Sequence, residues 1–179
     1  MFIAHLPAGY ILARHLLQKR HPVPATRRAI LVAAMAGAIA PDLDMLYVYL
    51  VDHGQTHHHT YPSHWPMLWF GLLAMSLAAM RQVKGRSWPV LALIVSLGGI
   101  LHLLLDSVVG DIWWLAPLLD RPYALFSVAA RVQPWWLNFL LHWSFALELL
   151  IVAWAVKLRW QPTSHPRQTR PSEPAEPQG

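Results

Sequence analysis

The sequence predicts an all-α fold, a polytopic membrane helical bundle with four to five membrane segments. Of the 179 residues, 55% are hydrophobic and 13% are charged, a balance far from that of typical soluble domains. The apolar residues are also concentrated in four runs. A hydrocarbon core about 30 Å thick takes roughly 17–25 helical residues to cross, so two runs are long enough and two are marginal. The runs are 29–51, 67–80, 90–105 and 135–156.

The alternative is a soluble all-helical bundle with buried helices, because stretches of roughly 14–17 residues alone do not exclude it. Four such runs in one short chain argue against it. Several of the ten tryptophans also lie near the ends of runs, where amphipathic rings favour a membrane interface.

The two ends of the chain differ from the rest. Residues 1–17 are apolar but contain Arg14 and His15, and they lack the basic start and small-residue cleavage site of a signal peptide. They predict either a short or re-entrant membrane helix or an interfacial helix. Residues 161–179 are rich in Pro, Ser, Thr, Gln and Arg. We therefore predict a membrane domain over 1–160 and a disordered cytoplasmic tail over 161–179.

The net charge of +5 comes from Lys and Arg that are concentrated in alternate connections. These are 19–28, 81–86 and the segment after residue 156, whereas 52–65 and 107–134 hold few basic residues. This is the positive-inside pattern, so the charge indicates topology and argues against a nucleic-acid partner. It predicts a multi-pass membrane protein with a cytoplasmic C-terminus. The absence of Cys excludes a disulfide or thiolate site.

Four separate segments place a polar side chain at one depth. Counted from the nearest basic residue at 1.5 Å per residue, these side chains lie about 21–24 Å above the cytoplasmic interface. They belong to His5, Asp42, His102 and His142. Ionisable groups inside apolar runs are costly and tend to be functional.

Two motifs add carboxylates near this level. In the Pro-Asp-Leu-Asp segment 41–44, proline interrupts a helix beside Asp42 and Asp44, and the break lets both side chains converge. Between His102 and Asp106 the i, i+4 spacing places an imidazole and a carboxylate on one helix face. This spacing suits two ligands of one metal, or a ligand and the residue that orients it.

The loop 57–64 adds four imidazoles on the side that these helix ends face: His57, His58, His59 and His64. Together the donors are hard or borderline, which suits Zn²⁺, with Mn²⁺ as the alternative. Each residue alone has another interpretation. A single intramembrane His is usually a packed residue, the two Asp residues at 42 and 44 can cap a helix, and the His run can be a solvated surface feature. The joint pattern favours a metal site.

At these residues the sequence resembles a family of bacterial inner-membrane proteins described as membrane-bound metal-dependent hydrolases, the YdjM-like group. The similarity covers about residues 1–125. Its marks are His5, the segment 41–44, the pair His59 and His64, the His102 to Asp106 motif, and the segment from Leu115 to Arg121. The family loop usually reads His-Arg, two variable positions and Thr-His-Ser, and this chain departs from it at Thr60, Ser63 and Trp65. The His-xxx-Asp pattern is also similar to that of zinc-dependent phospholipase C.

The resemblance implies a membrane-bound, metal-dependent hydrolase of the bacterial inner membrane, acting near the periplasmic face on a phosphoester or lipid. Its implied ligands are too many for one zinc ion and suit two. Asp44 is also a candidate catalytic base. Arg121 and His142 are candidates for substrate binding, although Arg121 can equally pair with Asp120 or Asp111. The implied ligands are His5, Asp42, Asp44, His59, His64, His102 and Asp106.

The alternative function is a non-enzymatic metal or proton transporter. A transporter has ionisable groups spread across the bilayer around a midplane site. Glu148, Arg14 and His15 depart from the common depth and keep this alternative open. A weaker third alternative is a structural factor in which the metal joins helices.

Overall fold

The computed structural model describes residues 1, 3–18, 24–134 and 136–161. Over these ranges the regular secondary structure is helical, apart from an isolated antiparallel bridge between Ile112 and Tyr123 in the irregular connection 107–134, so the all-α prediction is confirmed. The predicted tail lies outside the described residues from position 162 onwards. The α-helices are α1 (His5–Gln18), α2 (Arg27–Ile39), α3 (Asp44–Leu50), α4 (Pro66–Gln82), α5 (Ser87–Asp106), α6 (Trp136–Leu140) and α7 (Ser144–Trp160), and the 3-10 turns are η1 (Pro41–Leu43), η2 (His58–Thr60) and η3 (Pro62–His64).

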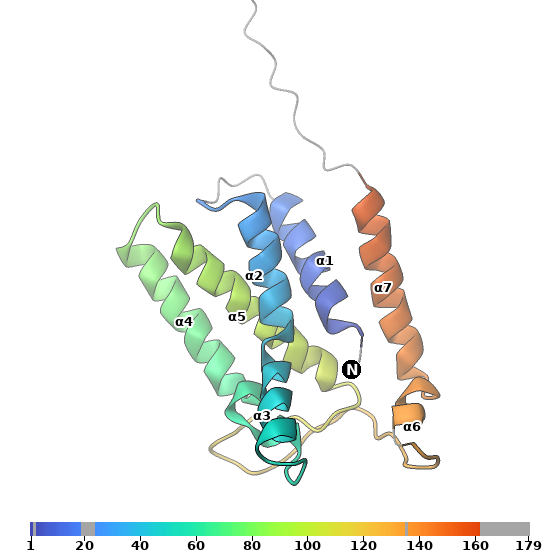
Figure 1. Cartoon of the computed structure of the whole chain (residues 1–179). Helices are drawn as coiled ribbons and strands as arrows, with labels where there is room; N and C mark the ends of the chain where they lie inside the picture. Colours follow the sequence, from blue (N-terminus) through green and yellow to red (C-terminus); the bar gives the residue numbers. More distant parts are fainter. Residues whose placement is uncertain (2, 19–23, 135, 162–179) are drawn as a thin grey trace, which may run out of the picture.

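Helix α5 is the element around which the others assemble. It packs against α2 and α4, α2 packs against α1, and α7 lies on the far side of α1 (Figure 1). The core between α1, α2 and α5 is built from small and branched apolar residues, which allow close helix contact. They are Ala13, Ile30, Ala33, Ala34, Val90 and Ile94.

The contact between α2 and α5 is close because glycines lie at the crossing. A Cβ built on Gly37 would meet the Val95 carbonyl oxygen at 2.2 Å, and one on Gly98 would meet the Ala38 nitrogen at 2.7 Å. A side chain at either position would force the helices apart. This crossing lies one turn from His102 and fixes how far α5 stands from the end of α2.

Helix α2 begins and ends at residues whose chemistry explains both boundaries. The Thr26 hydroxyl accepts a hydrogen bond from the Ala29 amide at 3.2 Å and caps the N-terminus. Pro41 follows the C-terminus, and proline has no amide hydrogen with which to continue the helix. The chain bends by 58° between Arg27–Ile39 and Pro41–Leu50. This bend points η1 and its carboxylate towards the end of α5.

The prediction of four to five membrane segments is wrong. Within the described ranges, α5 is the one helix long and apolar enough to cross a membrane, and a second span is counted only if α2 and the bent segment after it are taken as one. Helices α4 and α7 have 17 residues each and α1 has 14. At 1.5 Å per residue, 17 residues reach about 25 Å, which is less than a hydrocarbon core of about 30 Å. Two of the four apolar runs, 29–51 and 135–156, are divided between helices by turns that hydropathy alone does not reveal.

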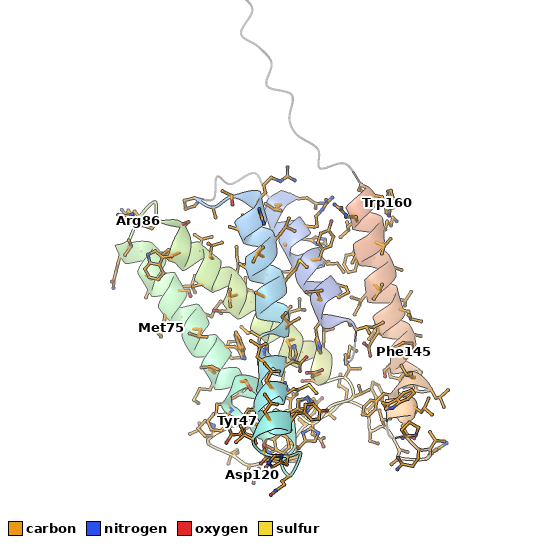
Figure 2. The ribbon with its side chains drawn as sticks, viewed as in Figure 1. Tyr47, Met75, Arg86, Asp120, Phe145 and Trp160 are labelled. Atoms are coloured by element: carbon orange, nitrogen blue, oxygen red, sulfur yellow. The ribbon has the colours of Figure 1, made fainter. Side chains whose placement is uncertain are left out.

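The two ends of the bundle differ in chemistry. The turn between α4 and α5 and the last turn of α7 lie at one end, where Figure 2 labels Arg86 and Trp160. Tyr47 and Asp120 lie at the opposite end, with α3, α6 and the long connection 107–134 (Figures 1 and 2). Lys84, Arg86 and Arg159 are exposed at the basic end. The His and Asp residues of interest lie at the other end, where α1 begins and α5 finishes.

Hydrogen bonds from helix α7 and the residue after it hold α1 near both of its ends. The Glu148 carboxylate, buried in α7, accepts hydrogen bonds from the Ile3 amide at 2.6 Å and the Ala4 amide at 3.2 Å. At the other end, the Arg14 guanidinium donates to the Gln161 carbonyl at 3.0 Å. Glu148 thereby fixes the start of the helix on which His5 is the first residue.

Candidate metal centre

Four segments that are distant in sequence meet at the end of the bundle opposite Arg86. They are the first turn of α1, the break after α2, the two short turns η2 and η3, and the last turn of α5 (Figure 1). Each brings a His or Asp side chain that the sequence singled out. Side chains that approach one another within 4.0 Å in pairs include those of His5, Asp42, His59, His64, His102 and Asp106.

Asp106 lies at the middle of this cluster and is almost fully buried. Its Oδ2 atom is 2.9 Å from His102 Nε2, 3.6 Å from His59 Nε2 and 4.0 Å from His64 Nε2. Its Oδ1 atom is 3.1 Å from His5 Nε2 and also pairs with the amino group of Met1. One carboxylate therefore faces four imidazoles, which come from α1, from the turns η2 and η3, and from α5. The Met1 ammonium is a positive group beside the same Oδ1 atom.

Asp42 forms the more open side of the cluster. Its Oδ1 atom lies 3.5 Å from His102 Nε2 and 3.8 Å from His64 Nε2, and its Oδ2 atom lies 3.6 Å from His5 Nδ1. Its side chain is 34% exposed, whereas that of Asp106 is 2% exposed. Solvent therefore reaches the cluster on the Asp42 side.

Hydrogen bonds on the outer side of three rings fix which nitrogen faces inward. His102 Nδ1 lies 2.8 Å from the Ala38 carbonyl oxygen and His59 Nδ1 lies 3.0 Å from that of Asp111. A carbonyl oxygen only accepts, so each Nδ1 carries the hydrogen and donates it. His64 Nδ1 donates to Asp44 Oδ2 at 2.8 Å. In the neutral form of each ring Nε2 then keeps its lone pair and faces inward, as it does in metal-binding histidines that donate Nδ1–H to an outer acceptor.

The inner atoms of the cluster have close neighbours but no hydrogen bonds. Among the described residues, His5 Nε2, His64 Nε2, His102 Nε2 and Asp106 Oδ2 are buried without a partner of hydrogen-bond geometry. Such groups are costly unless something satisfies them. Donor atoms of Asp42, His64, His102 and Asp106 all lie within 4.8 Å of one another. This buried His/Asp cluster could hold a metal ion, and its orphaned atoms fit that use.

A second group of donors adjoins the first. His58, His59 and His64 each offer a ring nitrogen, and these atoms also lie within 4.8 Å of one another. Burial lowers the pKa of His59 to about 2 and that of His58 to about 4. Both rings are therefore neutral at pH 7, which is the form that binds metals.

Asp44 lies behind His64, outside the two groups of converging donors. Its Oδ2 atom accepts from His64 Nδ1 and, at 2.5 Å, from the Ser63 hydroxyl. The sequence treated Asp44 as a ligand or a base, and the structure gives it the geometry of a residue that orients a ligand. Ser63 was not among the predicted site residues, and His58 was predicted only as one of the four loop imidazoles and not as one of the implied ligands. In the sequence, Ser63 is adjacent to His64 and His58 is adjacent to His59. Each pair lies in one short 3-10 turn, η3 or η2, so the neighbour of a predicted ligand also comes close to the cluster.

The two predicted substrate-binding residues lie apart from the converging donors. His142 lies in the connection between α6 and α7, where its Nδ1 is 2.9 Å from the Ser144 hydroxyl. Arg121 is exposed on the connection 107–134, next to Asp120, which accepts a hydrogen bond from Trp113 Nε1 at 2.6 Å. The Trp113 ring lies 6.5 Å from that of His57. The loop that carries Arg121 thus borders the histidine run.

A comparison with family models matches residues 1–164 to the YdjM inner membrane protein family. The chain belongs to this family. The match covers every described helix and all of the His and Asp residues discussed above. Searches of curated proteins and of solved structures give no match. The resemblance noted from the motifs alone is therefore confirmed as membership.

Membership in the YdjM family places the protein at the inner membrane, and the family description specifies no reaction. Helix α5 fits that location, since it is a candidate membrane span by length and composition. In this YdjM-family protein the candidate metal centre lies at the C-terminal end of that helix, because His102 and Asp106 occupy its last turns. The cluster is thus expected near one surface of the membrane.

Proposed function

We propose that this YdjM-family protein is a metal-dependent hydrolase that acts on phosphoester or lipid substrates at the non-cytoplasmic face of the inner membrane. One observation carries the proposal, namely that donor atoms of Asp42, His64, His102 and Asp106 converge within 4.8 Å while several of them are buried and unpaired. Such an arrangement is unfavourable in a purely structural core and is relieved by a cation.

The donor set favours zinc. Two imidazole nitrogens, from His64 and His102, face two carboxylates, from Asp42 and Asp106, and His5 adds a further imidazole from α1. Zinc accepts these ligand types at about 2.0–2.2 Å, and Mn²⁺ is the alternative for a site rich in carboxylate oxygen. The chain has no Cys, so thiolate ligation does not compete.

Zinc bound with one coordination position open supplies Lewis acidity and lowers the pKa of a bound water to about 7. The protein's own contribution is to hold the ligands and to move a proton. We assign the proton acceptor to the Asp42 oxygen that does not bind the metal, because this carboxylate is the exposed one of the cluster and water reaches the donors there. Asp44 orients His64 through the Nδ1 hydrogen bond.

A binding role for Arg121 follows from its place on the connection that borders the site. The same connection supplies the Asp111 carbonyl that holds His59, so its position is coupled to the histidines. A guanidinium matches the oxygens of a phosphate with two parallel hydrogen bonds. Arg121 therefore suits the anionic group of a phosphoester.

The orientation that we propose for α5 puts its Arg86 end in the cytoplasm. Lys84 and Arg86 are exposed where α5 begins, and basic residues are retained on the cytoplasmic side of a span. The candidate metal centre then faces the periplasm. The basic end of α7, with Lys157 and Arg159, lies on the same side as Arg86, so the C-terminus is cytoplasmic (Figure 2).

The transporter alternative is less well supported. Glu148 and Arg14, which kept it open, bind backbone groups at the two ends of α1. A transport path needs ionisable groups in reach of one another across the bilayer. The convergent donors instead lie at one end of the bundle, which favours a surface site.

The proposal is tested with the full-length protein purified in detergent. Metal content is measured by mass spectrometry, and hydrolysis of phosphoester and phospholipid substrates is measured before and after chelation. We expect bound zinc or manganese, activity that chelation removes, and loss of both in His102→Ala. The matched control is His15→Ala, an exposed histidine further along α1. A metal-free, inactive wild-type protein would overturn the proposal.

A further inference from the structure

Five imidazoles form a continuous row through the candidate metal centre. The ring centroids of His5 and His102 lie 3.8 Å apart, those of His102 and His64 5.3 Å, and those of His64 and His59 4.6 Å. His58 continues the row, 4.1 Å from His59 and 5.3 Å from His64. The row is therefore longer than the shell of a single ion.

A simple limit on coordination distances shows why one ion does not use the whole row. Zinc–nitrogen bonds are about 2.0–2.1 Å, so two nitrogens on one ion lie at most about 4.2 Å apart. His5 and His58 lie at opposite ends of the row, separated at least by the rings of His102 and His64. The donors instead fall into two overlapping groups, one with Asp42 and His102 and the other with His58 and His59.

We propose that His58 and His59 form a second cation site beside the first, with the Asp106 carboxylate bridging the two ions. This inference rests on the proposed function and deepens it, since it makes the centre binuclear. His64 belongs to both donor groups, and it binds one ion through Nε2 because Nδ1 of the same ring is engaged by Asp44. The cation class is a divalent metal that accepts imidazole, with zinc first.

Asp106 has the geometry that a bridge requires. Its Oδ2 atom lies between donors of both groups, 2.9 Å from His102 Nε2 and 3.6 Å from His59 Nε2, while its Oδ1 atom faces His5. Two metals in hydrolytic centres lie about 3.5–4 Å apart, a separation that one carboxylate spans. The Asp106 side chain is 2% exposed and its Oδ1 atom already pairs with the Met1 ammonium, so a cation beside Oδ2 would compensate the buried charge on its other side.

The position of His59 is fixed before any metal binds. Its Nδ1 atom donates to the Asp111 carbonyl, and its ring lies against Gly110, where a built Cβ would come within 2.7 Å of His59 Cε1. The ring therefore presents Nε2 towards Asp106, at 3.6 Å from Oδ2. His58 is half-buried beside it. A pre-positioned imidazole next to a shared carboxylate is the core of the second site.

A centre with two cations is suited to the hydrolysis of an anionic ester. In two-metal centres, the pair of cations stabilises the attacking and the leaving oxygen of a displacement at phosphorus. The second cation lies on the His57 side of the cluster, next to Trp113 and the connection that carries Arg121. The substrate class implied is therefore a phosphate ester, with its anionic group directed towards that connection.

The first test is zinc stoichiometry in full-length protein equilibrated with Zn²⁺ alone. We expect about two ions per chain in the wild type. The double variant His58→Ala/His59→Ala should keep one ion. The matched control is His57→Asn, because Asn retains an acceptor for the His59 amide that His57 Nδ1 now caps. It should keep both ions.

The outcomes separate the two proposals. One ion in the wild type together with chelator-sensitive hydrolysis overturns the second site and leaves the proposed function intact. No ion and no hydrolysis overturns both. If the double variant and His57→Asn lose the same amount of bound zinc, the histidine run binds zinc adventitiously, and this result also overturns the second site.

A second readout tests the bridge directly and does not depend on activity. With Mn²⁺ alone as the probe, two ions that share the Asp106 carboxylate couple magnetically, so the spin-resonance spectrum loses the hyperfine pattern of an isolated ion. The double variant His58→Ala/His59→Ala should restore that pattern. An isolated-ion spectrum in the wild type at full loading would show separate ions and overturn the bridge.

Discussion

Asp44 Oδ2 accepts the Nδ1 hydrogen of His64 at 2.8 Å, from a residue twenty positions away in the sequence. The same oxygen accepts the Ser63 hydroxyl at 2.5 Å, so the carboxylate holds both residues of one short turn. The Trp69 indole adds a hydrogen bond to the Ser63 carbonyl at 2.7 Å. His64 is therefore oriented from behind, and its Nε2 atom points into the cluster.

Replacement of this carboxylate by an amide should weaken metal binding without abolishing it. An outer carboxylate fixes the tautomer of a ligating histidine and raises its basicity, and its loss typically costs roughly 10–100-fold in affinity. We expect a loss of that size in Asp44→Asn, measured by competition with a zinc chelator. The control is Asp52→Asn, which alters a carboxylate bonded to Thr56 outside the cluster. Equal affinities in the two variants would contradict an orienting role for Asp44.

A methyl group at Gly110 should displace His59. The added Cβ would come within 2.7 Å of His59 Cε1, closer than carbon atoms approach without a shift of one partner. We expect Gly110→Ala to bind one zinc ion fewer than the wild type while it keeps the ion held with His102. Zinc content by mass spectrometry measures this. Wild-type stoichiometry in the variant would argue that His59 is not a ligand.

The close crossing of α2 and α5 should be sensitive to a single methyl group. In Gly98→Ala the new Cβ would meet the Ala38 nitrogen at 2.7 Å, and Ala38 also provides the carbonyl that holds His102. Overpacking of this kind costs about 1–3 kcal/mol, so we expect a lower midpoint of thermal unfolding and weaker zinc binding.

The chain contains a matched control for that substitution. Gly71 lies within α4, and a Cβ built there has no atom within 4 Å. Gly71→Ala should be neutral or stabilise the protein by up to about 1 kcal/mol, because Gly is unfavourable inside a helix. Similar midpoints for the two variants would mean that the crossing tolerates the added carbon.

The orientation of α5 is testable by labelling, and the absence of native Cys makes single introduced cysteines specific. In intact cells, an impermeant thiol reagent should label Gln55→Cys, on the side of the candidate metal centre, and not Lys84→Cys at the opposite end of α5. Both positions are exposed, so access depends on the membrane alone. Labelling of position 84 but not of position 55 would show that α5 has the opposite orientation in the membrane.

Several features followed from the sequence because they depend on neighbouring residues. Apolar runs predicted the helical class, and Pro41 predicted the break after α2 because proline cannot continue a helix. The i, i+4 spacing placed His102 and Asp106 on one face, and their side chains lie 2.9 Å apart. The motifs also pointed to the YdjM family, which the match over residues 1–164 confirms.

Only the tertiary structure decided how many helices are long enough to cross a membrane and which atom of each donor faces the cluster. Hydropathy does not show where a helix bends, so the run 29–51 counted as one span although the chain turns by 58° within it. Residue type does not distinguish the role of Asp42, whose carboxylate faces the converging donors, from that of Asp44, whose carboxylate orients a histidine. The two roles differ because Asp44 contacts His64 of η3. The choice of an inward-facing Nε2 at His102 depends on the Ala38 carbonyl of another helix. These relationships join residues far apart in the chain, and packing fixes them because it alone sets the distance between segments.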